Sequence, residues 1–288
     1  MQKEIKSVTV VGLGVIGGSF AIALSKLNYK VWGVDCNVET LQKAKNARAI
    51  CDGDVVPDKF FPQSDMIIMC LYPAQIADYI ARYRDFFPSD CIVIDVAGLK
   101  SHFIDKIENV LPQNVEFVFC HPMAGREKKG FDFADARVFL NANFIITPTA
   151  RTSRTAIEKV IFLAKEIGFG NIKEINAIAH DEIIAFTSQL PHAIAVALIN
   201  SDKNFKETGG FVGDSYRDLT RIANINGELW TELFLNNKSN LLGKIKEFEK
   251  ELDIIKMALQ NDDKSALLEK FAQSTERRNN LDNRWHRH

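Results

Sequence analysis

The stretch that decides the fold is residues 8–18, which read Val8-Thr-Val-Val-Gly12-Leu-Gly14-Val-Ile-Gly17-Gly18. An apolar, β-branched run leads into a G-x-G-x-x-G pattern, and an apolar helical pattern follows it. In such a loop the first glycine allows a tight turn, the second lets a pyrophosphate approach the backbone, and the third lets helix and strand pack closely. The stretch predicts a strand, a glycine turn and a helix whose N-terminus binds phosphates.

The same region has no charged residue from Ser7 to Ser25, a length that suggests a membrane span. The crowding of glycines in its centre and the β-branched residues before them favour the strand–turn–helix interpretation. A signal peptide is not indicated either, because the run has no convincing cleavage site and continues into a structured pattern. We therefore expect a cytoplasmic protein that has no membrane partner.

The cofactor is indicated by Asp35, which ends a second predicted strand 23 residues after Gly12. A carboxylate there can accept hydrogen bonds from both ribose hydroxyls, and it would repel the extra phosphate of NADP. No arginine follows it, since the next residues are Cys36, Asn37 and Val38. We predict NAD as the cofactor, bound by Gly12, Gly14, Val15, Ile16, Gly17, Asp35 and Pro73.

Short apolar runs alternate with amphipathic helices as far as about residue 175, which predicts a mostly parallel sheet with helices on both faces. The fold class is α/β, with a doubly wound, Rossmann-type domain over residues 1–175. The predicted strands are Ser7–Val11, Lys30–Val34, Met66–Leu71, Cys91–Asp95, Val115–Cys120 and Asn143–Thr147. The predicted helices are Ser19–Leu27, Val38–Ala47, Ala74–Phe87, Ser101–Val110 and Ser153–Ile167.

After residue 175 the strand signal stops. Residues 176–201 form an apolar helical pattern in which Pro191 predicts a kink or a new start. A later stripe repeats at spacings of four and three, typical of an amphipathic helix that packs in its own domain or against a second chain. We favour an all-α domain over residues 176–288 that binds substrate and forms a homodimer. The stripe consists of Leu241, Ile245, Phe248, Leu252, Ile255 and Leu259.

Charge and cysteine content exclude other classes of function. The 288 residues include 36 Lys and Arg and 37 Asp and Glu, so the chain lacks the basic surplus on which nucleic-acid binding draws. Its five cysteines form no C-x-x-C pair, and no metal-ligand spacing is present. We expect free thiols in a reducing cytoplasm, no metal and no nucleic-acid partner.

His121 is the first candidate for chemistry outside the nucleotide loop. It directly follows the predicted strand Val115–Cys120, and ligands of open α/β sheets collect at the carboxyl ends of strands. An imidazole there can take a proton from an alcohol as hydride leaves its carbon. A histidine whose ring is satisfied by backbone at a strand end explains the position alone equally well.

Two more polar clusters lie in the helical region. Ser188 and His192 share a helix face if the helix continues through Pro191, and either substrate or a buried internal hydrogen bond would satisfy them. Arg217 and Arg221 lie four residues apart, and each follows an aspartate by three residues. They form either local salt bridges or a carboxylate-binding site, for which the guanidinium group is well suited.

Taken together, the motifs resemble those of the prephenate dehydrogenase family, which includes the arogenate and cyclohexadienyl dehydrogenases of tyrosine biosynthesis. The resemblance covers essentially the whole chain. The glycine loop with Asp35 is shared by many dehydrogenases, whereas the other three motifs, in this order, are specific. They are His121-Pro-Met-Ala-Gly125 with Glu127, Ser188-Gln-Leu-Pro-His192, and Asp218-Leu-Thr-Arg221-Ile-Ala with Trp230.

The resemblance implies a fold, an activity and residue roles. It implies a Rossmann-type domain, a helical dimerising domain, and NAD-dependent oxidative decarboxylation of prephenate to 4-hydroxyphenylpyruvate, CO₂ and NADH. The family's catalytic histidine, which hydrogen-bonds the ring hydroxyl of the substrate, corresponds to His121, and its carboxylate-binding arginine to Arg221. Asp181 and Asp218 correspond to supporting polar positions. The predicted catalytic residues are His121, His192 and Arg221, and the predicted substrate-binding residues are Ser188, Glu127 and Gly98.

Gly98 is a departure from the family pattern. Many members place a serine near the reacting hydroxyl, in a pattern like Asp-x-x-Ser-x-Lys, where this chain reads Asp95-Val-Ala-Gly98-Leu-Lys100. Glycine has no side-chain donor, so the hydroxyl is either absent or supplied by water or by Ser101.

Other functions are less favoured. The motifs do not decide between prephenate and arogenate. Another two-domain NAD-dependent hydroxyacid dehydrogenase would typically use a lysine on the interdomain helix, and residues 176–192 contain none. A non-catalytic NAD-binding protein is disfavoured because both His121 and the glycine motif are intact.

Overall fold

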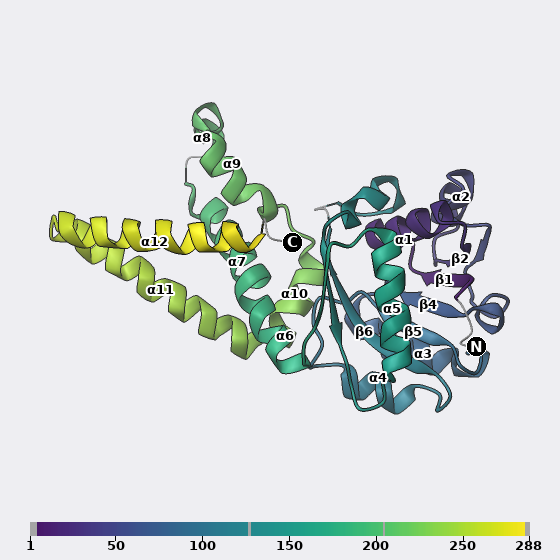
Figure 1. Ribbon diagram of the computed structural model, residues 1–288. Helices are drawn as coiled ribbons and strands as arrows, with labels where there is room; N and C mark the ends of the chain where they lie inside the picture. Colours follow the sequence, from purple (N-terminus) through teal and green to yellow (C-terminus); the bar gives the residue numbers. More distant parts are fainter. Residues whose placement is uncertain (1–4, 126–127, 204, 286–288) are drawn as a thin grey trace.

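The computed structural model describes residues 5–125, 128–203 and 205–285 (Figure 1). In it, eight strands form one sheet, in the order β3-β2-β1-β4-β5-β6-β7-β8. Neighbouring strands are parallel except β6 and β7, which are antiparallel. The order reverses between β1 and β4, which in open α/β sheets marks the crevice where ligands bind. The strands are β1 (Ser7–Val11), β2 (Lys30–Val34), β3 (Asp52–Asp54), β4 (Met66–Met69), β5 (Ile92–Asp95), β6 (Glu116–Met123), β7 (Asn143–Thr147) and β8 (Asn171–Glu174).

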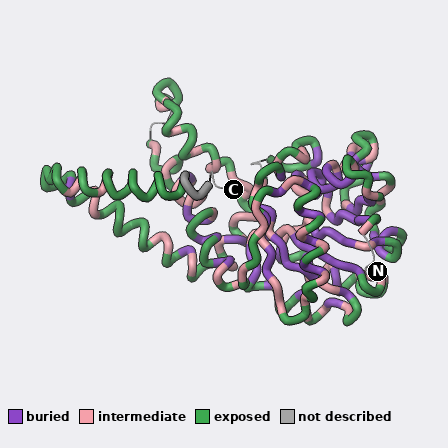
Figure 2. The backbone as a smooth tube through the Cα atoms, viewed as in Figure 1, coloured by how far each residue is buried: buried purple, intermediate pink, exposed green. Residues whose placement is uncertain are grey.

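Helices cover both faces of the sheet, which explains why its central strands are apolar. Val8 and Val10 of β1 belong to one core with helices α1, α2 and α5, whereas Val11 belongs to the other core with α3 and α4. Figure 2 shows that buried residues concentrate in the sheet. These helices are α1 (Val15–Lys26), α2 (Val38–Asn46), α3 (Pro73–Arg82), α4 (Ile104–Val110) and α5 (Arg154–Ile167). The predicted Rossmann-type α/β fold is confirmed.

The glycine loop joins β1 to α1 as the sequence predicts. Gly12 has a φ of +85°, in the left-handed region that favours glycine. A Cβ on Gly17 would lie 1.8 Å from the carbonyl oxygen of Gly12, so only glycine fits where the helix crosses the loop. A Cβ on Gly14 would meet nothing within 4 Å. Packing within the protein therefore does not require a glycine at position 14.

The sheet contains two short strands that the sequence does not predict, and β6 is longer than predicted. The strands β3 and β8 read Asp-Gly-Asp and Asn-Ile-Lys-Glu, and they show no apolar run because each lies at an edge of the sheet. The prediction that His121 directly follows a strand is wrong in detail, because β6 continues to Met123. Its antiparallel partner β7 pairs with it from Phe119 to Met123, beyond the last residue that pairs with β5.

From Ala177 onwards the regular structure of the described chain is helical. Helix α6 continues into α7 through a π-helical turn, Ala185–Gln189, so that Pro191 marks a widened turn rather than a new helix. Proline has no N–H for the α-helical bond to residue 187, and the wider turn before it accommodates the missing donor. The helices are α6 (Ala177–Ile184), α7 (Leu190–Ser201), α8 (Phe205–Thr208), α9 (Asp214–Thr220), α10 (Gly227–Asn236), α11 (Lys238–Gln260) and α12 (Lys264–Trp285).

By length and apolar composition alone, the helical stretch Ala177–Ser201 could cross a membrane. In the monomer, 28% of the most apolar segment of this stretch is buried. One such helix is weak support for a membrane span, because core helices of soluble proteins meet the same criterion. Here the stretch carries Asp181 and His180, both of which are buried against the sheet domain or its loops. The contacts of these polar groups account for its position in the fold.

Helices α11 and α12 form a hairpin that projects away from the sheet (Figure 1). The predicted amphipathic helix is α11. Leu241 is buried, but Phe248, Leu252 and Leu259 remain exposed, and Figure 2 shows that most of the hairpin is exposed. A row of exposed apolar side chains is typical of a surface that contacts another chain.

The close approach at Gly17 predicts a difference between two alanine substitutions. Gly17→Ala forces a Cβ against the Gly12 carbonyl oxygen, so we expect the free energy of unfolding to fall by about 3 kcal/mol or more. Gly14→Ala meets no atom and should leave stability unchanged or slightly raised. Thermal unfolding of both variants checks this, and equal melting temperatures would contradict the role of Gly17.

Candidate active site

One cavity of about 800 Å³ lies where residues following β1, β4 and β5, and the end of β6, meet helices α6, α7 and α10. Its lining connects the glycine loop to the helical part of the chain. The predicted site residues in the lining are Gly14, Val15, Ile16, Gly17, Pro73, Gly98, His121, Ser188 and His192. The fold therefore brings together most of the predicted site residues, although they come from distant parts of the sequence.

His121 is held by a second histidine, His180 of α6. Its Nδ1 lies 3.0 Å from Nε2 of His180, and Nδ1 of His180 lies 2.7 Å from Oδ1 of Asp181. The other ring nitrogen, Nε2 of His121, lies 3.8 Å from where a Cβ on Gly98 would be. His121 thus presents one nitrogen to the protein and one to the cavity.

The surroundings of His121 favour its neutral form. Desolvation lowers its pKa well below the usual histidine range, and the nearby His180 and Lys100 act in the same direction. A neutral imidazole has one ring nitrogen without a hydrogen, and that nitrogen can accept a proton. His121 is therefore suited to act as a base near neutral pH.

Lys100 lies behind this wall of the cavity, fully buried. Its Nζ lies 2.5 Å from Oδ2 of Asp95 and donates to the carbonyl oxygens of Ala97 at 3.0 Å and Cys120 at 2.6 Å. Each of its three hydrogens thus has an acceptor. The ion pair joins the end of β5 to the residue before His121.

Gly98 lies beside His121 in the cavity lining. A Cβ there would make only ordinary van der Waals contacts, the nearest with Leu233 Cδ2 at 3.5 Å, so packing does not require a glycine at this position. Ser101 is exposed and lies outside the described lining of the cavity. Its hydroxyl therefore does not replace the serine that the family pattern places at this position.

Ser188 and His192 lie on one wall of the cavity, which confirms that they share a face. The π-helical turn brings the carbonyl oxygen of Ser188 within 2.8 Å of His192 Nδ1. Because a carbonyl only accepts, this nitrogen carries the hydrogen. The His192 ring also stacks on Trp230, with ring centroids 3.7 Å apart. Both contacts fix the orientation of the imidazole.

The glycine loop supplies the nucleotide end of the cavity. The absent Cβ of Gly14 leaves backbone accessible there, which fits the approach of a pyrophosphate. Asp35 and Gly12 are not among the residues that line this cavity. The Asp35 carboxylate lies beside the loop, because its Oδ2 accepts a hydrogen bond of 2.7 Å from the backbone N–H of Leu13.

Two further predicted site residues, the catalytic Arg221 and the substrate-binding Glu127, are not placed in the cavity. Arg221 is exposed at the end of α9 and outside the described lining, although the next residue, Ile222, is part of it. Glu127 lies outside the described residues. Their roles stay predictions.

Sequence reasoning assigned no role to His180 and missed Gln189 and Asn237. The Asn237 amide donates to the carbonyl oxygen of Asp181 and to Oε1 of Gln189, each at 2.8 Å, and Gln189 donates to the carbonyl oxygen of Leu233. These buried groups join the α6–α7 region to α10 and α11. The available signal was a polar residue within an apolar helical pattern, since buried polar groups need partners.

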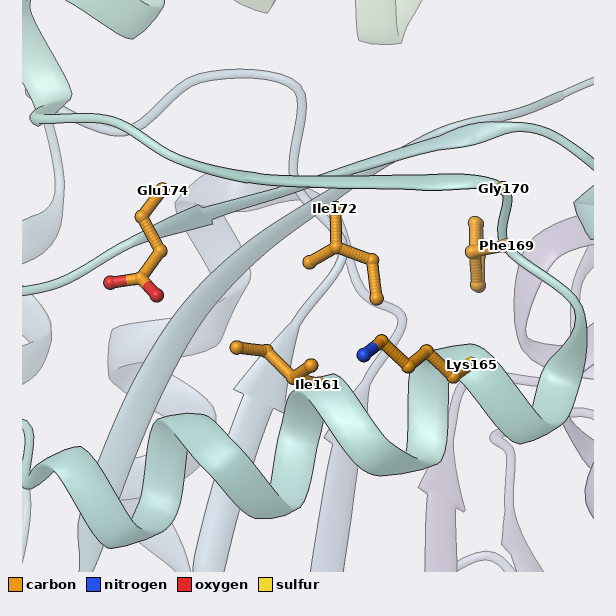
Figure 3. A pocket seen from close by; sticks show the side chains of 6 residues that line it. All are labelled: Ile161, Lys165, Phe169, Gly170, Ile172 and Glu174. Atoms are coloured by element: carbon orange, nitrogen blue, oxygen red, sulfur yellow. The ribbon is translucent and has the colours of Figure 1, made fainter. Parts of the chain in front are cut away.

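A second cavity, of about 260 Å³, lies between α5 and β8 at the edge of the sheet. Figure 3 shows Ile161 and Lys165 of α5 facing Ile172 and Glu174 of β8. It contains none of the predicted site residues. Among the residues that the structure describes, no group of His, Cys, Asp and Glu side chains could hold a metal ion.

Comparisons with known proteins agree with this geometry. Residues 20–172 match the sequence model of the prephenate dehydrogenase nucleotide-binding domain, and residues 176–273 match that of the prephenate dehydrogenase dimerization domain. The chain is 30% identical to a cyclohexadienyl dehydrogenase of Zymomonas mobilis, over 95% of each chain. It is 27% identical to a prephenate dehydrogenase of Bacillus subtilis, over 98% of this chain and 77% of the relative.

A solved structure is similar over nearly the full length. The prephenate dehydrogenase of A. aeolicus, in complex with hydroxyphenyl propionate and NAD⁺, superposes with a TM-score of 0.87 at 26% identity, covering 98% of this chain and 100% of that one. The nucleotide-binding domain and this neighbour support NAD as the cofactor. The chain is an oxidoreductase that belongs to the prephenate dehydrogenase family.

Proposed function

We propose that the protein catalyses the NAD-dependent oxidative decarboxylation of prephenate to 4-hydroxyphenylpyruvate, CO₂ and NADH, a step of tyrosine biosynthesis. The observation that carries the proposal is the position of His121. Its Nε2 is on the side of a cavity that is also lined by the glycine loop and by Ser188 and His192 of the helical part. A hydride acceptor and a ring hydroxyl can therefore meet beside a neutral base.

The proposed reaction balances with His121 as the only proton carrier. His121 takes the proton of the ring hydroxyl while hydride leaves the carbon that bears it. When bound, NAD⁺ supplies the acceptor for that hydride. The bond to the ring carboxylate then breaks, CO₂ leaves, and the electron pair makes the ring aromatic. The proton returns from His121 to the ring oxygen, which becomes the phenol of the product.

Substrate binding requires groups that fix two carboxylates and the ring. Ser188 and His192 offer polar contacts on one wall of the cavity. Arg221 would bind one carboxylate through its guanidinium group, reaching the cavity from its position next to Ile222. The family resemblance assigns Glu127 to substrate binding as well, and the cavity beside Gly98 would receive part of the substrate or a water molecule.

NAD is favoured over NADP by Asp35. Its carboxylate is fixed next to the glycine loop by the Leu13 amide and by a hydrogen bond of 2.9 Å from the Asn37 amide. A negative charge held there would repel a ribose phosphate and accept hydrogen bonds from ribose hydroxyls.

The helical part is proposed to form the interface of a cytoplasmic homodimer. The supporting observations are the match to a dimerization domain and the exposed apolar side chains on this part of the chain. On α6 and the π-helical turn, Ile178 and Phe186 are 75% and 57% exposed in the monomer. A second copy would cover such a surface at little cost in polar desolvation.

Arogenate is the second candidate substrate. It differs from prephenate in carrying an amino group where prephenate has a keto group, at a position remote from the reacting hydroxyl. The similarity to a cyclohexadienyl dehydrogenase keeps this alternative open. The proton transfer assigned to His121 would be unchanged.

An absorbance assay of NADH formation tests the proposed function directly. Purified protein is mixed with NAD or NADP and with prephenate or arogenate, in all four combinations. We expect rapid NADH formation with prephenate and NAD, and slower reduction of NADP. Activity with arogenate alone would transfer the proposal to that substrate, and no reduction in any mixture by protein that still binds NAD would refute it.

The pH dependence should reflect the lowered pKa of His121. The base must be neutral, so kcat/KM falls as the pH drops through that pKa. Because this pKa lies below the ordinary histidine value of about 6.5, activity should persist at mildly acidic pH. A pH profile of kcat/KM checks this, and an acid limb centred above the ordinary value would be inconsistent with His121 as placed.

Arg221→Ala tests the assignment of the carboxylate-binding residue. We expect KM for prephenate to rise about tenfold or more, because a charge-assisted hydrogen bond is lost, with a smaller change in kcat. Arg217→Ala is the matched control, since Arg217 is an exposed arginine of α9, four residues before Arg221, and pairs with Asp214 at 3.2 Å. An unchanged KM in the Arg221 variant would exclude the role.

A further inference from the structure

Behind the base lies a chain of three side chains that ends in a carboxylate. His121 Nδ1 lies 3.0 Å from His180 Nε2, and His180 Nδ1 lies 2.7 Å from Asp181 Oδ1. His180 and Asp181 are 1% and 3% exposed. Asp181 is itself fixed, because the backbone N–H groups of Lys100 and Ser101 donate to its two oxygens at 2.9 and 2.8 Å.

The hydrogen positions in this chain follow from the acceptor at its end. Burial raises the pKa of Asp181, but hydrogen bonds from His180 and Ser101 outweigh it, so the net shift is downward and Asp181 is a carboxylate. A carboxylate only accepts, so His180 carries its hydrogen on Nδ1. An imidazole that carries its one hydrogen on Nδ1 accepts at Nε2. With His180 in this form, His121 donates to it from Nδ1. This leaves Nε2 of His121 without a hydrogen, on the side of the cavity.

We propose that His180, anchored by Asp181, is a positioning residue that fixes His121 in the tautomer able to accept the substrate's proton. The proposal rests on the proposed role of His121 as the base. As His121 takes the proton, its Nδ1–H bond to His180 becomes charge-assisted and strengthens. The carboxylate at the end of the chain stabilises the positive charge, as the aspartate does in a Ser-His-Asp triad.

A positioning partner helps His121 to act as a base because its imidazole is shielded from water. Desolvation keeps the imidazole neutral but also makes it a weak base. A partner whose bond strengthens only while the proton is being transferred stabilises the transition state more than the ground state. The anchor belongs to α6, whereas His121 belongs to β6, so the base is complete only when the helical part is packed against the sheet.

Kinetics of a double-mutant cycle test the proposal. His180→Asn should lower kcat about 100-fold or more, while KM for prephenate and the Kd for NAD stay nearly constant. His121→Asn should lower kcat at least as much. If His180 acts through His121, adding His180→Asn to His121→Asn should cause no further loss. His102→Asn, at an exposed histidine that contacts Lys106, is the matched control.

A purely structural His180 would give a different pattern. In that case, His180→Asn would reduce the activity of the His121→Asn variant by the same factor as it reduces the activity of the wild type. That result would overturn the proposal. So would a His180→Asn variant with normal kcat. Thermal unfolding of each variant separates lost activity from lost fold.

A second measurement uses the unmodified protein and needs no substrate. Nitrogen NMR of ¹⁵N-histidine-labelled protein distinguishes ring nitrogens that carry a hydrogen from those that do not. We expect neutral His121 with its hydrogen on Nδ1. A hydrogen on Nε2 would overturn the proposal, whichever substrate the enzyme uses. A hydrogen on Nδ1 would support it even if another substrate were found.

Discussion

The buried ion pair between Lys100 and Asp95 is the constraint on which the site depends. Both side chains are fully buried, and the ammonium is satisfied only because Asp95 and the carbonyl oxygens of Ala97 and Cys120 converge on it. Removing one partner of such a pair leaves an uncompensated charge and costs about 3–5 kcal/mol. Asp95 also accepts from the backbone N–H of Cys120. The pair therefore fixes the backbone of β6 directly before His121 relative to β5, and the loop after β5 that carries Gly98.

A second set of polar contacts fixes the helical part relative to this sheet edge. Asp181 binds the backbone of the loop after β5, and Asn237 joins the Asp181 carbonyl to Gln189 of the π-helical turn. The turn in turn sets the positions of Ser188 and His192 on the cavity wall. Because buried polar groups are costly without partners, these contacts allow few alternative packings of the two parts. The cavity is thus bounded by two elements whose relative position is specified by hydrogen bonds rather than by apolar packing alone.

Local patterns in the sequence predicted much of this arrangement. The glycine loop, the central strands, α5 with its end at Ile167, and α11 follow from periodicity and turn chemistry. The motifs around His121, Ser188 and His192 indicated residues that the fold brings together. The partners of those residues were not predictable in the same way. Lys100 and His180 gain their surroundings from segments about 20 and 60 residues away, and no local pattern records such pairs. The edge strands β3 and β8 lack an apolar face, and α12 carries few apolar residues, so neither gives a strong periodic signal.

The central claim is that Nε2 of His121 accepts the proton of the substrate's ring hydroxyl. The most direct test is a crystal structure of the protein with NAD⁺ and hydroxyphenyl propionate, in which the distance from His121 Nε2 to the ring oxygen is measured. We predict a distance within hydrogen-bond range, about 2.6–3.2 Å, with the nicotinamide adjacent to the same ring carbon. A ring oxygen bound instead by another side chain, with His121 Nε2 beyond the reach of a bridging water, would contradict the claim.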